Sequence, residues 1–139
     1  MSKTRSSAGL CAVLFLLQPM ISSRGVLAET ASGSWEDYEH VSIIQLIATP
    51  LDFDGKKVMV CGFATMEFEG TALYLTRDDM KHSNDKNGLW LDVRDWEVKR
   101  KQFDRQFIKA FGVFKAGIKG HRGAFSGTIQ EIARMYVGR

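Results

Sequence analysis

A chain of 139 residues, of which 45% are hydrophobic and 25% are charged, is long enough for one small domain with a single core. The formal net charge is +3. Three of the basic residues lie in an N-terminal stretch that we expect to be removed, which leaves equal numbers of basic and acidic residues. The basic charge of the whole chain is therefore no evidence for nucleic-acid binding.

The first 28 residues have the pattern of a signal peptide. Lys3 and Arg5 precede an apolar run from Leu10 to Leu17, which is too short to span a bilayer, and Val26-Leu27-Ala28 provides a cleavage site. We expect cleavage after Ala28 and a periplasmic or secreted product, with an uncleaved N-terminal anchor as the alternative. No later stretch is apolar enough to be a transmembrane segment.

Residues 29–41 are polar and rich in small residues, which predicts a flexible N-terminal segment before a domain at 42–139. Ser42 with Gln45 three positions on is a capping box, so a short helix should begin there and end at Pro50. We expect the apolar residues of this helix to fill one face: Ile43, Ile44, Leu46 and Ile47.

Five strands are predicted in the rest of the chain. The first is a long alternating run, Lys57 to Phe68, which Gly62 interrupts as a bulge or bend would. The run places Val58 and Val60 on one face and Cys61 and Phe63 on the other. The remaining strands are expected within 71–76, 89–93, 107–114 and 124–137, with a polar loop at 77–88, a short helix at 95–106 and a glycine-rich loop at 115–123.

This order predicts a mainly β fold, a small closed barrel in which Gly62 lets one strand serve both halves. The pattern P-x-x-F-x-G-K-x-V-x-V-x-G-F from Pro50 to Phe63, with the segments ALYL, NGLWLD and GHRGAFSGTI, resembles small exported bacterial proteins of the OB (oligonucleotide/oligosaccharide-binding) fold. The resemblance extends over roughly Ser42 to Ile132. It implies a five-stranded Greek-key barrel, with no activity and no functional residue attached.

Aromatic residues on the outer face of the second and third strands are the candidate ligand site. In these strands Leu73, Leu89 and Leu91 should face the core, which leaves Tyr74 and Trp90 outward with Asp92. With Phe63 alongside, these rings would stack on a base, a sugar or a protein side chain. The alternative, which we favour slightly for Trp90, is that it packs under a loop or under the terminal helix.

The glycine-rich loop offers a second candidate, an anion contact. Lys119, His121 and Arg122 alternate with glycines, and backbone amides with cations can hold an anion. The segment lacks the order of a P-loop. A connection that needs positive φ is the interpretation we favour.

The sequence indicates no catalytic residue, metal site or cofactor. His40, His82 and His121 are far apart, and the segment SNDKNG fails as a calcium loop because Arg94 stands where a carboxylate pair is needed. Cys61 lacks a nearby cationic residue or helix start, so we interpret it as a packing residue, with an intermolecular disulfide as the alternative.

Together these features predict a non-catalytic exported binding module that recognises a protein or another cell-envelope component. The alternative is binding of single-stranded nucleic acid or an oligosaccharide on the same face. Neutral charge and export both count against a nucleic-acid partner. The basic cluster at 99–105 is interpreted as a solvated helix face, with a patch for phosphate, anionic lipid or an acidic protein as the minority interpretation.

Overall fold

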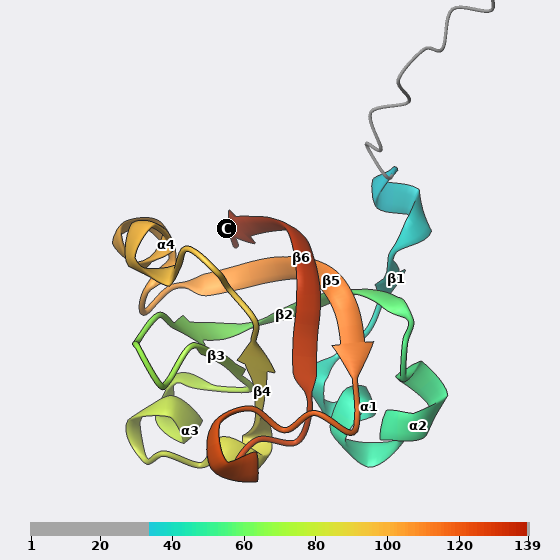
Figure 1. Ribbon diagram of the computed structural model, residues 1–139, viewed down its shortest axis with the longest axis horizontal. Coiled ribbons are helices and arrows are strands. Elements are labelled where there is room, and N and C mark those ends of the chain that lie inside the picture. The colour runs from blue at the N-terminus through green and yellow to red at the C-terminus, as the bar shows by residue number, and fades with distance from the viewer. Residues whose placement is uncertain (1–33, 139) are drawn as a thin grey trace, which may run out of the picture. The chain divides into compact units, whose positions relative to one another are not determined.

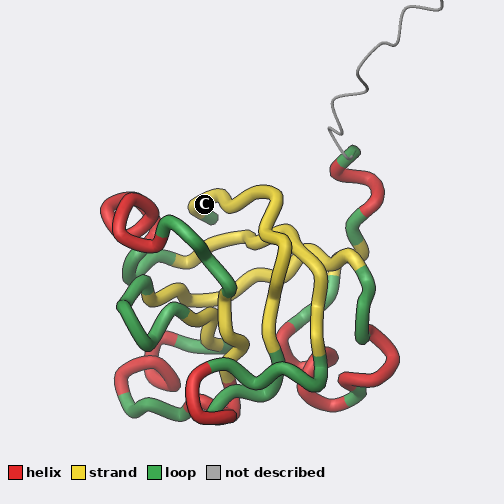
Figure 2. Tube along the Cα trace, in the orientation of Figure 1, coloured by secondary structure: helices red, strands yellow, loops and turns green. Residues whose placement is uncertain are grey.

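The computed structural model describes residues 34–138 (Figures 1 and 2). The predicted signal peptide and residues 29–33 lie outside the described residues. Within the described part of the chain, no helix has the length and apolar character needed to cross a membrane.

The fold is mainly β, and five of its strands close into a barrel. The order around the barrel is β2-β3-β4-β6-β5, and β5 pairs back onto β2. All neighbours in the barrel are antiparallel except β4 and β6, which run parallel. A helix and β5 come between these two strands in the chain. The predicted OB-like barrel is confirmed. The strands are β1 (Glu39–His40), β2 (Lys57–Thr65), β3 (Ala72–Tyr74), β4 (Gly88–Leu91), β5 (Phe107–Lys115) and β6 (Thr128–Val137).

β2 passes from one half of the barrel to the other at Phe63, one residue beyond the predicted Gly62. Residues 57–63 pair with β5, whereas residues 63–65 pair with β3. A Cβ atom on Gly62 would lie 2.7 Å from the Tyr74 carbonyl oxygen and 2.8 Å from Ile43 Cδ1. No other residue has room at this crossing.

The core fills the interior of the barrel, and the alternation of β2 has the predicted phase. Val58 and Val60 face inward and are fully buried, whereas Cys61 on the opposite face is half-buried. Leu73, Leu89 and Leu91 are also fully buried, as expected. Two helices add Ile43, Leu46 and Phe103 to this core.

The helix predicted at Ser42 is α1 (Ile43–Ala48), and both hydrogen bonds of its capping box are present. Ile44 was expected on the buried face but is 59% exposed, because six residues of helix bury a narrower stripe than we predicted. Pro50 ends α1 and also begins a second short helix, α2 (Pro50–Phe53), that the sequence analysis missed. Proline is favoured at the first helical position because it has no N–H to leave unpaired.

The loop predicted at 77–88 contains two short helices, α3 (Arg77–Lys81) and η2 (Asp85–Asn87). The helix predicted at 95–106 is confirmed as α4 (Trp96–Phe103), and a further turn, η3 (His121–Gly123), lies in the glycine-rich loop. The described part of the predicted flexible segment contains η1 (Trp35–Asp37) and β1, which pairs in parallel with β2. The pairing therefore begins before the predicted boundary at Ser42.

Candidate functional site

A cavity of about 800 Å³ lies against the outer face of β2 and β3. Four connections around the barrel form its walls: the β2–β3 turn, the α3–η2 segment, the α4–β5 turn and the η3 loop. In Figure 1, α3 and the connection between β5 and β6 lie side by side at one end of the barrel, and Ser126 N–H donates to the Gly88 carbonyl there. The cavity is thus built by segments far apart in the sequence.

Three aromatic rings form the floor of the cavity. Phe63 and Tyr74 are cross-strand partners in β2 and β3, and Phe125 packs against Tyr74 with ring centroids 6.1 Å apart. The three side chains are only 8%, 6% and 4% exposed, so the rings stabilise the floor and offer little open face. Gly88 in β4 is the cross-strand partner of Tyr74, and a Cβ added to Gly88 would lie 3.1 Å from the Tyr74 ring.

The Tyr74 hydroxyl joins this floor to one wall. It donates a hydrogen bond of 2.8 Å to Asp85 in η2. Burial, the hydrogen bond and the nearby charges of Asp85 and Glu67 raise the pKa of Tyr74 well above its usual range. The hydroxyl therefore stays protonated near neutral pH and serves as a fixed donor.

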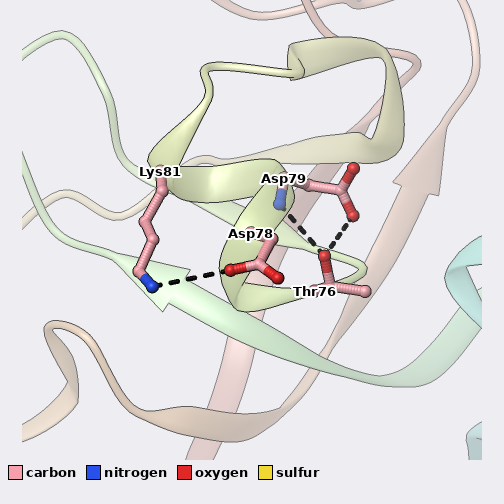
Figure 3. Close-up of polar contacts among 4 residues, drawn as sticks. All are labelled: Thr76, Asp78, Asp79 and Lys81. Atoms are coloured by element: carbon pink, nitrogen blue, oxygen red, sulfur yellow. Dashed lines mark hydrogen bonds and ion pairs between the residues drawn. The ribbon is translucent and has the colours of Figure 1, made fainter.

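Asp79 holds the α3–η2 wall together. Thr76 caps α3 by accepting from the Asp79 N–H at 3.0 Å, and its own hydroxyl donates back to the Asp79 carboxylate (Figure 3). The other carboxylate oxygen accepts from the side-chain amides of Asn84 and Asn87 at 2.9 and 2.8 Å. The hydrogen bond from Thr76, followed by that from Asn87, lowers the pKa of the Asp79 carboxyl, so the wall is fixed by a charged group.

The η3 loop is tied to two of the other walls. Lys86 donates to the Gly123 carbonyl at 3.3 Å, and Ser126 donates to the Lys86 carbonyl at 2.6 Å. On the other side, His121 Nε2 lies 3.7 Å from the Glu69 carboxylate of the β2–β3 turn. Side-chain contacts therefore connect three of the four walls.

Backbone strain gathers at this cavity. Four residues other than glycine have positive φ in the described chain, and three of them line the cavity: Ser83 (51°), Arg105 (56°) and Arg122 (54°). The fourth, Glu131, lines a second cavity of about 600 Å³ beside β6. Left-handed backbone at residues with a side chain is costly, and it tends to persist at functional sites.

Four of the residues predicted as contacts come together here, and three do not. Phe63, Tyr74, His121 and Arg122 line the cavity, although we had assigned them to two separate candidate sites. Tyr74 points away from the barrel axis, as predicted. It is not free for stacking, however, because Phe125 and η2 cover it.

The other three predicted contacts lie elsewhere. Trp90 packs under the loop, as the alternative prediction had it: a Cβ on Gly120 would lie 2.7 Å from it, and its ring centroid is 5.5 Å from that of Phe125. Asp92 is exposed and lines the second cavity. Lys119 is exposed and does not line the main cavity.

Two further arginines, Arg77 and Arg105, line the cavity and were not among the predicted residues. The guanidinium of Arg77 lies 5.0 Å from the centre of the Phe63 ring. The signal that would have placed Arg77 is the spacing of Thr76 and Asp79, which marks the start of a helix. No local signal marks Arg105, because its conformation depends on a hydrogen bond from its N–H to the Ala64 carbonyl on β2.

Cys61 lies on the outer face of β2, away from the cavity. Its sulfur is 3.8 Å from Met59 Sδ, and its cross-strand partner is Lys109 in β5. Burial raises the pKa of the thiol, and the charge of Lys109 opposes this shift without cancelling it. These surroundings are those of a packing residue. The intermolecular disulfide stays a prediction.

A scan against protein-family models, a search of curated proteins and a search of solved structures found no match to this chain.

Proposed function

We propose that this chain is an exported bacterial protein whose barrel is a non-catalytic binding module. It recognises a protein or another component of the cell envelope at the cavity over β2 and β3. The N-terminal leader pattern of residues 1–28 supports export. The cavity over β2 and β3 supports the binding role.

The observation that carries the proposal is a preorganised cavity on the outside of a barrel whose interior is filled. Three of its walls are joined by hydrogen bonds and by the contact between His121 and Glu69. Three strained residues lie in its lining. A rigid, concave and mainly polar lining holds a ligand with little loss of conformational entropy.

The polar groups of the cavity support a binding role more than a catalytic one. Tyr74 is a weak acid here because its pKa is raised, and its hydroxyl is held by Asp85. His121 Nε2 lies 3.7 Å from the Glu69 carboxylate, so this pair helps to join two of the walls. The walls therefore use these groups to hold one another.

The geometry gives less support to bases or sugars as ligands. Stacking requires an open ring face, and the three rings of the floor are at most 8% exposed. Carboxylates of Glu67, Glu69 and Asp85 also line the cavity and would repel a chain of phosphates.

The test is to fill the cavity and follow partner capture. Ala124→Trp places a bulky side chain in the lining, and Met80→Trp does so from α3. The immobilised chain should capture a reproducible partner from envelope extract, and both variants should lose it. Ala48→Trp, at an exposed position on α1, should keep it. Intact mass of the exported chain should give Glu29 as its first residue.

Three outcomes contradict the proposal. One is capture that survives in both cavity variants while their thermal unfolding stays close to that of the parent chain. A second is that the immobilised parent chain captures no specific partner from envelope extract. The third is that the exported chain still begins at Met1.

A further inference from the structure

Three arginines reach the cavity from three different elements. Arg77 lies in α3, Arg105 in the turn before β5 and Arg122 in η3. Among residues 34–138 none of the three takes part in an ion pair, whereas Lys81, which also lines the cavity, is paired with Asp78 at 3.5 Å. Guanidinium groups without a partner in a preformed cavity are free to bind an anion.

The backbone fixes the positions of two of these arginines. Arg105 has φ of 56°, and its N–H donates to the Ala64 carbonyl at 2.9 Å. Arg122 has φ of 54°, and the next residue, Gly123, accepts from Lys86. A strained backbone conformation persists where the surrounding contacts hold it in place. Here both strained residues place a long cationic side chain in the lining of the same cavity.

Arg77 is positioned by the contact of its guanidinium with a ring of the floor. The guanidinium lies 5.0 Å from the Phe63 ring centre. A guanidinium over a ring keeps its N–H groups available at the edge of its plane, where they match the two oxygens of a carboxylate. The floor therefore orients this donor group and leaves it unsatisfied.

Two of the three carboxylates in the lining already have partners. Asp85 accepts from Tyr74, and Glu69 faces His121. The lining as a whole holds four Arg and Lys side chains and three carboxylates, and this small excess of positive charge favours one compact anion and opposes a densely charged polymer.

We propose that this cavity binds a carboxylate presented by a peptide partner, held by Arg77, Arg105 and Arg122. The inference depends on the proposed function, because it names the chemistry recognised at the same site. A peptide fits better than an acidic sugar, since the ring faces that a sugar would stack on are covered. The carboxylate is either the chain terminus or an Asp or Glu side chain, and the experiment separates the two.

The probes are four degenerate heptapeptide pools with a fluorescent label. The central residue is Glu or Gln, and the C-terminus is free or amidated. The pools that carry the recognised carboxylate, either the central Glu or the free C-terminus, should bind the purified chain about tenfold more tightly than the Gln, amidated pool. The pool that keeps this preference tells whether the terminus or the side chain supplies the carboxylate.

Arg77→Gln, Arg105→Gln and Arg122→Gln should each weaken binding of the preferred pool and reduce its preference over the neutral pool. Arg134→Gln is the matched control, because Arg134 is exposed on β6 and lines only the second cavity. It should leave both quantities unchanged.

Equal binding of all four pools, or no binding of any, overturns the inference. So does an Arg134→Gln effect as large as that of the cavity variants, or tighter binding of oligogalacturonate than of any peptide pool. If partner capture still depends on Ala124 and Met80 in that case, the proposed function stands and only the carboxylate assignment fails.

Discussion

At the scale of single residues, Tyr74 connects the barrel to the site. Its ring packs on the outer face of β3 against Phe125, and its hydroxyl holds Asp85 in the neighbouring wall. The residue is 6% exposed. A side chain in this position contributes to stability and to the shape of the cavity at once.

Tyr74→Phe should lower the free energy of unfolding by about 1 kcal/mol, because one buried hydrogen bond is lost while the ring is kept. The effect depends on pH. The pKa of Tyr74 is raised in the folded state, and in the unfolded chain it is near its ordinary value of 10.0. Above pH 10 the unfolded chain releases a proton that the folded chain keeps, so the stabilisation is lost as pH rises.

Urea unfolding of both proteins from pH 7 to 11 measures this difference, which should narrow above pH 10. Tyr136→Phe is the control, because Tyr136 is 50% exposed on β6. Parallel curves for the parent chain and Tyr74→Phe would show that the hydroxyl is not held as described.

At the scale of elements, α3 shows how a very short helix becomes a stable wall. It has five residues, too few to be stable alone, and its end is held by Thr76 and by the hydrogen bonds of Asp79 (Figure 3). Arg77 and Met80 in this helix line the cavity, so the shape of the cavity depends on α3 being folded.

Thr76→Ala should cost about 1 kcal/mol of stability, the usual effect of removing an N-cap. Hydrogen exchange should accelerate at the amides of Met80 and His82, which donate to Thr76 and Asp78 in this turn. Ser42→Ala removes the cap of α1 in the same way and should accelerate exchange in residues 43–49 only. Unchanged exchange at 77–87 in Thr76→Ala would contradict the role given to this cap.

At the scale of the whole molecule, closure of the barrel depends on β2 pairing with both β3 and β5. This pairing also joins two parts of the chain that differ in charge. β2 lies within residues 29–98, which hold 6 basic and 14 acidic residues, and β5 lies within residues 99–139, which hold 10 basic and 2 acidic residues. Phe63 is the residue that belongs to both ladders, and the Gly62 position next to it is packed on by backbone as well as by side chains.

Gly62→Ala should reduce the free energy of unfolding by about 1–3 kcal/mol, the usual effect of overpacking a core. The Tyr74 carbonyl, 2.7 Å from the added Cβ, belongs to the β3 backbone and cannot rotate away. Gly117→Ala is the matched control, because a Cβ there has no neighbour within 4 Å. Equal urea midpoints for the two variants would mean that the packing at Gly62 is less tight than the structure indicates.

Local signals in the sequence were sufficient for most of the barrel and for two of the helices. Alternation gave the faces of β2, and the capping box gave the start of α1. Helix α3 and strand β1 were missed because five and two residues are too few to show a period. Strand β1 also depends on its pairing with β2. The sequence also supplied Phe63, Tyr74, His121 and Arg122 as candidates, but in separate groups.

The sequence by itself determined the buried faces of β2, β3 and β4, since alternation depends only on neighbouring residues. The need for a glycine at position 62 was decided by the tertiary structure, because Tyr74 of β3 and Ile43 of α1 limit the space there. The tertiary structure alone also decided that the four candidate residues share one cavity with Arg77 and Arg105. The physical reason is the parallel pairing of β4 with β6, which joins Trp90 to Thr128 and brings the η3 loop over β3. Contacts between segments that distant in the chain depend on closure of the whole barrel and leave no pattern in a single segment.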